Sequence, residues 1–178
     1  MSKPIILIAA CDEKGGIGYK NALPWILPED LLRFKQWTTS ISDEKKRNMI
    51  IMGRNTWESL PYRPLSKRFN MVLTRHPEEI EQEFMNIDTR DGSYCGSLYE
   101  ALEYANGDST IEKIYIIGGA SLYNQVLKKN LCEKILLTRV HGIHDADTYL
   151  DKIPAAHYKV HDVKECAGHD FVVYTRRY

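Results

Sequence analysis

Short apolar runs of strand length recur along this chain, and they constrain its fold more than any other feature. They consist mainly of aliphatic residues and methionine, and they occur at residues 5–10, 49–52, 71–73 and 114–117. A continuous apolar run of this kind is expected of a strand covered on both faces, which is typical of parallel sheets. Helical patterns lie between and after the runs, near residues 28–39, 54–60, 97–106 and 120–129.

The C-terminal part has a different character. Three strand-like segments at residues 134–141, 158–163 and 170–176 follow one another without a long helix, which indicates antiparallel strands at one edge. We therefore expect an α/β fold with a mixed, mostly parallel central sheet, helices on both faces and an antiparallel C-terminal edge. Residues 1–178 are expected to form one domain, with polar stretches 39–47 and 78–83 as solvated loops.

Charge and cysteine content exclude several classes of protein. Lys and Arg number 24, as do Asp and Glu, so nothing indicates binding to nucleic acid or to an acidic membrane surface. The apolar N-terminal run predicts a first strand rather than a signal peptide, and no segment reaches the length of a membrane span. The four cysteines are scattered, as expected of reduced thiols in a cytoplasmic protein.

A glycine-rich segment follows the first predicted strand. Gly15, Gly16 and Gly18 precede Leu23-Pro24-Trp25, so the segment is either an ordinary loop or a mobile lid over a site. A helix is then expected from Pro28. Its Asp30 shares a face with Phe34, and Leu31 lies three positions before Phe34. This carboxylate either belongs to a site or simply favours the positive end of the helix.

Two buried strands end in glycines just before a helix. Gly53 precedes Arg54, and Gly118-Gly119 precedes the helix near residue 120. Backbone N–H groups at such turns bind phosphate well, although many turns of this kind are only solvated. Arg54 and Arg75 follow the carboxyl ends of two strands, where an adenosine 2′-phosphate could be held. The His- and Asp-containing residues 141–147 fit no zinc spacing, and we expect no metal.

In this order, the segments resemble the dihydrofolate reductase family over nearly the whole chain. The resemblance is carried by Ile8-Ala9-Ala10, Gly16-Ile17-Gly18, Leu23-Pro24-Trp25, Leu27-Pro28-Glu29-Asp30, residues 52–59, Arg63-Pro64-Leu65, Ile117-Gly118-Gly119 and Asp147-Thr148. It implies NADPH-dependent reduction of 7,8-dihydrofolate, with hydride transfer to pterin C6 and protonation of N5. It also implies that dihydrofolate and folate analogues are the partners of a monomeric enzyme.

The resemblance further implies roles for individual residues. Asp30 would bond the pterin, assisted by Thr138 and by a water near Trp25, and Leu23 would belong to the loop that closes on the reaction. The substrate site would comprise Ile8, Ala9, Asp30, Leu31, Phe34, Leu60, Arg68, Ile117, Tyr123 and Thr138, with Arg68 on the glutamate tail. The cofactor site would comprise Ala10, Ile17, Gly18, Gly53, Arg54, Asn55, Thr56, Leu73, Thr74, Arg75, Gly118, Gly119, Ala120, Ser121 and Leu122.

Two alternatives remain open at this point. A pyrimidinone reductase of riboflavin synthesis would share the general fold and cofactor, and a non-catalytic nucleotide-binding protein could keep the fold alone. The Leu-Pro-Trp segment, Asp30 and Arg68 favour the folate reaction. The chain also departs from family patterns, because Ser121 stands where many bacterial members carry an arginine, and Pro61-Tyr62 replaces a tighter connection.

Overall fold

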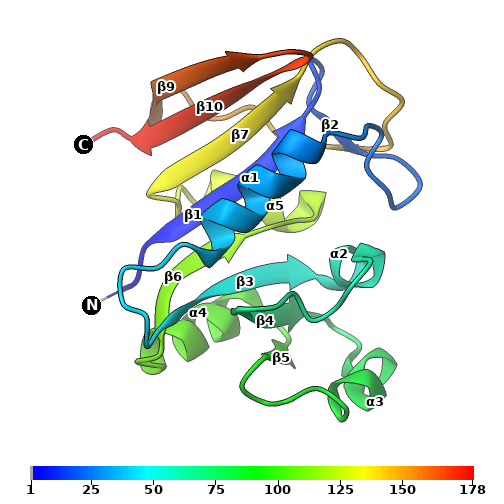
Figure 1. Ribbon diagram of the computed structural model, residues 1–178, viewed down its shortest axis with the longest axis vertical. Coiled ribbons are helices and arrows are strands. Elements are labelled where there is room, and N and C mark those ends of the chain that lie inside the picture. Colours follow the sequence, from blue (N-terminus) through cyan, green and yellow to red (C-terminus); the bar gives the residue numbers. More distant parts are fainter. Residues whose placement is uncertain (1) are drawn as a thin grey trace.

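A computed structural model describes residues 2–178. The fold is centred on one eight-stranded sheet (Figure 1). Its strands lie in the order β5-β4-β3-β6-β1-β7-β10-β9. Their bounds are β1 Ile5–Cys11, β3 Arg47–Gly53, β4 Arg68–Leu73, β5 Gly92–Cys95, β6 Ile111–Ile116, β7 Lys134–Val140, β9 Tyr158–Cys166 and β10 His169–Arg176. The strands from β5 to β7 are parallel, whereas β10 pairs antiparallel with both β7 and β9. This confirms the mostly parallel sheet and its antiparallel C-terminal edge.

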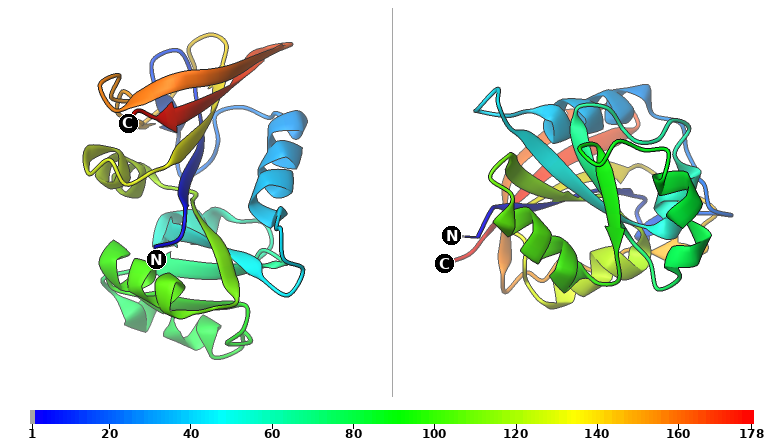
Figure 2. Two further views of the ribbon diagram at one scale, coloured as in Figure 1. Left: turned by 90° about the vertical axis from the view of Figure 1, so that its left-hand side faces the viewer. Right: turned by 90° about the horizontal axis from the view of Figure 1, so that it is seen from below.

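Helices cover both faces of the sheet (Figure 2). They are α1 Pro28–Thr39, α2 Arg54–Ser59, α3 Glu81–Phe84, α4 Leu98–Gly107 and α5 Ala120–Lys128, with a short 3-10 helix, η1, at Pro77–Glu79. Local sequence explains where two of them begin. Pro28 occupies the first turn of α1 beside two acidic residues, and the Ser97 hydroxyl caps α4 by accepting from the Glu100 N–H at 3.2 Å. Among these helices of residues 2–178, none is both long and apolar enough to cross a bilayer.

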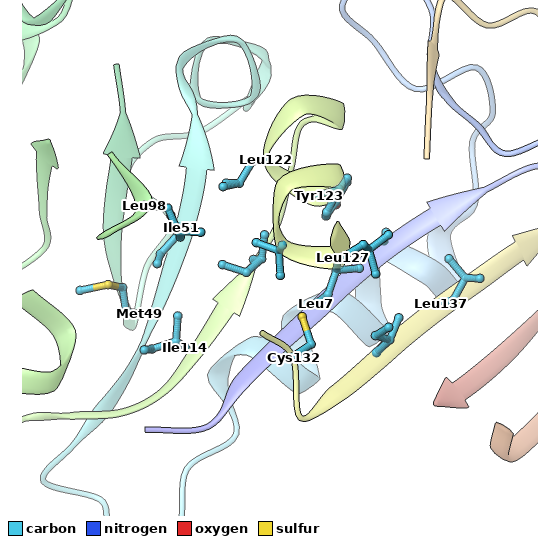
Figure 3. Packing of buried hydrophobic residues seen from close by; sticks show 14 of the residues in the cluster. Leu7, Met49, Ile51, Leu98, Ile114, Leu122, Tyr123, Leu127, Cys132 and Leu137 are labelled. Atoms are coloured by element: carbon cyan, nitrogen blue, oxygen red, sulfur yellow. The ribbon is translucent and has the colours of Figure 1, made fainter. Parts of the chain in front are cut away.

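The core consists of two apolar clusters, one on each face of the sheet. In β1 the side chains alternate, so that Leu7 and Ala9 enter one cluster while Ile6 and Ile8 enter the other. The first cluster packs the sheet against α4 and α5 (Figure 3). The second packs it against α1 and α2. The chain therefore leaves the neighbouring strands β1 and β6 for opposite faces. Ligands of such sheets bind beyond the carboxyl ends of strands that diverge in this way, and this region is called the opening below.

Three parts of the structure differ from the sequence expectation. Residues 78–83 are not simply a solvated loop, because η1 and α3 form there and the side chain of Ile80 is 2% exposed. The glycine-rich segment contains a short strand, β2 (Gly16–Gly18), which pairs with β8 (Thr148–Tyr149). The edge strand β5 was also not predicted. All four cysteines are free.

Candidate active site

Asp30 lies at the opening between α1 and the carboxyl ends of the central strands. Its Oδ1 accepts a hydrogen bond of 2.5 Å from the Thr138 hydroxyl. Thr138 belongs to β7 and pairs in register with Ala10 of β1. The Asp30 side chain is 18% exposed, and the Arg33 guanidinium lies 4.0 Å from the same oxygen. One oxygen of the carboxylate is therefore held by the protein, while the other has no protein donor among residues 2–178 and can meet a ligand.

Trp25 supplies a second polar group that the protein leaves unsatisfied. The side chain is buried, and its indole Nε1 has no hydrogen-bond partner among residues 2–178. Its ring meets the His144 ring edge-on, with centroids 5.6 Å apart. A buried indole N–H usually finds a partner, so this group fits a bridging water or ligand. No sequence pattern predicted the contact between Trp25 and His144.

Arg68 is buried at the start of β4 and is oriented by two protein groups. Its Nε donates to the Ser66 carbonyl at 2.8 Å, and its Nη1 donates to the Thr38 hydroxyl at 3.0 Å. Burial lowers the pKa of the Arg68 guanidinium, but arginine stays protonated in proteins. Thr38, near the end of α1, is thus a positioning residue that sequence reasoning missed.

The carboxyl ends of β3 and β6 meet at glycines. The Gly53 N–H donates to the Gly118 carbonyl at 2.9 Å, and the Gly118-Gly119 peptide is cis. Gly118 has φ +123°, a conformation that L side chains rarely adopt, and a Cβ there would lie 3.3 Å from the Tyr123 ring. A side chain at Gly118 would therefore be both strained and crowded against Tyr123, so this corner requires glycine.

The first turn of α5 adjoins the glycine corner and lacks a side-chain cap. Its free N–H groups make a suitable site for an anion. Ser121 is exposed there, whereas the Leu122 side chain lies in the core, so Leu122 can offer a ligand only its backbone. The Tyr123 hydroxyl donates to the Ile8 carbonyl at 2.7 Å. Burial, followed by the nearby Asp30 charge, raises the pKa of Tyr123.

Three polar residues lie at or beyond the carboxyl ends of β3 and β4. Thr74 is buried, and its hydroxyl accepts from the His76 N–H at 3.0 Å. Arg75 is exposed and has no ion-pair partner within residues 2–178. Arg54 instead pairs with Glu79 and lies 3.8 Å from Glu58. Of the two predicted arginines, Arg75 is thus the one whose charge is not already paired.

Hydrogen bonds to Asp12, in addition to the β2–β8 pairing, connect the glycine-rich segment to residues 144–150. The buried carboxylate of Asp12 accepts from the N–H groups of Lys14 and Gly16 at 2.9 Å each and from that of His144 at 2.8 Å. Burial alone raises the pKa of Asp12, but these backbone donors outweigh it, and the net pKa is lowered. Asp12 therefore stabilises the base of the segment in its ionised form.

Asp12→Asn is expected to lower the free energy of unfolding by about 2 kcal/mol at pH 7, because buried N–H groups lose a charged acceptor. The folded-state pKa lies below the unfolded value of about 3.9, so the contribution is complete above that value and disappears as pH falls through the folded pKa. Denaturant unfolding of both proteins between pH 7 and pH 2 measures the difference. A difference that stays constant over this range would contradict the assignment.

The predicted apolar residues are placed on several sides of the opening. Leu23 and Leu31 are 52% and 55% exposed, which leaves apolar surface that a bound ring could cover. Phe34 and Leu60 are half-buried against the α1-side cluster, which also contains Ile8 and Ile117. Ala9 is buried within the other cluster, and Ile17 and Leu73 pack against it. Thr56 adjoins Gly119, and its hydroxyl lies 3.4 Å from where a Cβ on that glycine would be. Asn55 is exposed on α2.

Comparison with known proteins identifies the relatives of this chain. The model of the family described as dihydrofolate reductase matches residues 4–176. The chain is 35% identical over 165 residues to the dihydrofolate reductase of Heliothis virescens, covering 92% of this chain and 86% of that protein. It is 36% identical over 150 residues to a putative dihydrofolate reductase of Caenorhabditis elegans, covering 83% and 77% respectively.

Longer relatives match through only part of their length. The bifunctional dihydrofolate reductase-thymidylate synthase 2 of Arabidopsis thaliana is 37% identical over 158 residues, which is 86% of this chain and 27% of that protein. The chain thus spans little more than a quarter of this relative.

Proposed function

Because this chain belongs to the dihydrofolate reductase family, we propose that it catalyses NADPH-dependent reduction of 7,8-dihydrofolate to 5,6,7,8-tetrahydrofolate. The observation that carries the proposal is the Asp30 carboxylate, bonded on one oxygen by Thr138 at the opening above β1 and β7. A protein that only bound a nucleotide would need neither this carboxylate nor the oriented guanidinium of Arg68.

The residues that follow β3, β4 and β6 are suited to bind nicotinamide adenine dinucleotide phosphate. The uncapped first turn of α5 can hold a pyrophosphate, and the Gly118-Gly119 corner leads directly into that turn. Thr74 and the unpaired Arg75 would hold the adenosine 2′-phosphate. When bound, the reduced nicotinamide supplies the hydride, and the protein contributes alignment and electrostatics.

Asp30 would orient the pterin ring. Thr138 fixes one carboxylate oxygen, so the other can accept from the amino and N3 side of the ring. Leu31 and Phe34 follow Asp30 on α1 and would cover one side of the ring, while Ile8 and Ile117 would line the sheet side. Fixing the ring in this way would hold pterin C6 in one position relative to the hydride donor, and hydride transfer requires such alignment.

Proton delivery would depend on water controlled by Trp25 and residues 15–25. The buried Nε1 of Trp25 lacks a protein partner within residues 2–178 and can hold one water by donating to it. Asp30 would bond the ring across from N5, so we assign it a polarising role rather than direct donation to N5. The exposed Leu23 would close over the reacting atoms and exclude other water.

The activity test follows near-ultraviolet NADPH absorbance after dihydrofolate is added to the purified protein. Rapid loss of absorbance, slower with NADH, is the expected result. No loss from folded protein that binds NADPH would overturn the proposal, and the pyrimidinone substrate of riboflavin synthesis would then be tested.

Arg75→Ala is expected to raise the KM for NADPH about 10- to 100-fold, as loss of a charge-assisted bond to phosphate would. The KM for NADH should change little, because NADH lacks the 2′-phosphate. Steady-state kinetics with both cofactors measures the effect. Arg90→Ala, at a fully exposed arginine bonded to Asp88, is the matched control. A parallel rise with both cofactors would contradict the assignment.

We further propose that the chain works as a single cytoplasmic reductase domain and as a monomer. One sheet carries both Asp30's partner Thr138 and the glycine corner, so a complete site needs no second copy. The equal numbers of acidic and basic residues give no argument for binding to nucleic acid.

A further inference from the structure

A metal-binding set of side chains lies beside α1, at the hairpin that joins β9 to β10. Cys166 ends β9, His169 begins β10, and the two residues pair directly across the hairpin. The two-residue turn between them includes Gly168, whose φ of +78° suits a tight reversal. Directly opposed residues project to the same face of a sheet, with Cβ atoms about 4.5–5.5 Å apart. The local fold therefore brings a thiol and an imidazole together.

The imidazole of His169 is buried and incompletely satisfied. Its side chain is 2% exposed, and its Nε2 has no hydrogen-bond partner among residues 2–178. The other nitrogen, Nδ1, lies 3.2 Å from the Ala167 carbonyl, which can only accept. The proton of the neutral ring is thus placed on Nδ1, and Nε2 keeps its lone pair. A histidine held by a backbone carbonyl in this way has the orientation common among metal ligands.

Glu29 completes the set from the first turn of α1. Its Oε2 lies 3.9 Å from His169 Nε2, which is too far for a hydrogen bond. The three potential ligand atoms of Glu29, Cys166 and His169 all lie within 4.8 Å of one another. Figure 1 shows the β9–β10 turn and the start of α1 at the same end of the sheet.

We propose that Glu29, Cys166 and His169 bind one zinc-like divalent cation. Thiolate, imidazole and carboxylate are all established zinc ligands, whereas Mg²⁺ and Ca²⁺ prefer sites built from oxygen alone. A thiolate and a carboxylate would neutralise the two charges of the ion. Three protein ligands leave a fourth position of a tetrahedral ion for water.

Arg33 is the charged side chain next to the proposed site. Its Nη2 lies 3.9 Å from Cys166 Sγ. The same guanidinium stacks on the Phe171 ring at 4.3 Å and lies 4.0 Å from Asp30. Its positive charge is therefore partly compensated before any cation binds.

The bound ion would join the start of α1 to the C-terminal hairpin, two segments far apart in the sequence. A ligand that binds only the folded protein raises its stability. The site does not depend on the reductase activity proposed above, and its test uses no substrate or cofactor.

The deciding experiment titrates Zn²⁺ into chelator-treated, reduced protein and measures stoichiometry, affinity and Tm. We expect one ion per chain and a rise in Tm. Cys166→Ser should weaken binding about 100-fold and abolish the rise, because even the loss of an outer-shell partner costs 10- to 100-fold. Titration with Co²⁺ should give a thiolate-to-metal charge-transfer band that is absent from Cys166→Ser.

Two further variants distinguish loss of the proposed metal site from loss of folding and from binding elsewhere on the protein. Glu29 is 72% exposed, so Glu29→Gln should stay folded, and it should weaken Zn²⁺ binding even where a hairpin variant is unstable. His76→Asn serves as the control, because His76, Glu78 and Glu79 form another group of possible ligands, one that lies on exposed residues. Its binding should match that of the unaltered protein. The proposal would be overturned by absent binding, by tight binding in Glu29→Gln, or by binding lost only in His76→Asn.

Discussion

Asp30→Asn is expected to lower the turnover of dihydrofolate by at least about 100-fold, on the usual scale for a group that stabilises charge or protons in the transition state. Asparagine keeps the size of the side chain and can still accept from the Thr138 hydroxyl, which now bonds Oδ1 at 2.5 Å. It removes the negative charge that would face the pterin. Turnover is measured from NADPH absorbance at saturating substrate, with NADPH binding measured separately.

Three accompanying measurements test the assignment of Asp30. NADPH binding should be unchanged, because the proposed cofactor residues lie elsewhere. Glu103→Gln makes the same carboxylate-to-amide change at an exposed position of α4, on the other face of the sheet, and should have no effect. Thr138→Val should cost about tenfold, the value of one hydrogen bond. Near-normal turnover in Asp30→Asn would remove this residue from the mechanism.

Arg68→Lys is expected to raise the KM for dihydrofolate about 100-fold while the KM for NADPH changes little. Lysine keeps the charge but loses the planar, bidentate geometry that suits a carboxylate. The buried guanidinium has two of its donor nitrogens bonded, to Ser66 and Thr38, and its remaining N–H groups would meet the glutamate α-carboxylate. Steady-state kinetics with each substrate varied in turn measures the effect.

The positioning role of Thr38 gives an independent test of Arg68. Thr38→Val removes the acceptor of the Nη1 bond and should raise the same KM by a smaller factor, about tenfold. Arg90→Lys makes the identical change at an exposed arginine and should leave both KM values unaltered. An unchanged KM for dihydrofolate in Arg68→Lys and in Arg68→Leu would contradict the assignment.

The sequence by itself determined the central sheet and the helices on its faces. Runs such as residues 5–10 and 114–117 predict buried strands because burial on both faces of a parallel sheet requires apolar side chains at nearly every position. The family resemblance also implied that Thr138 assists Asp30, and the structure contains a hydrogen bond between the two side chains.

Only the tertiary structure decided the short and peripheral elements. The edge strand β5, Gly-Ser-Tyr-Cys, has no apolar run, because its residues after Gly92 are only partly buried at the sheet edge. The β2–β8 pairing is held by backbone groups more than a hundred positions apart, and backbone bonds leave no side-chain pattern. Residues 78–83 form helical turns around the buried Ile80.

Contacts between side chains distant in the sequence were also decided by the tertiary structure. Thr38 accepts a hydrogen bond from Arg68, which lies 30 positions later in the sequence. Glu29 of α1 lies close to His169 of β10. Hydrophobic periodicity reports which face of an element is buried, but not which polar groups meet there. That depends on how α1 lies across the sheet, which is fixed by packing of the whole core.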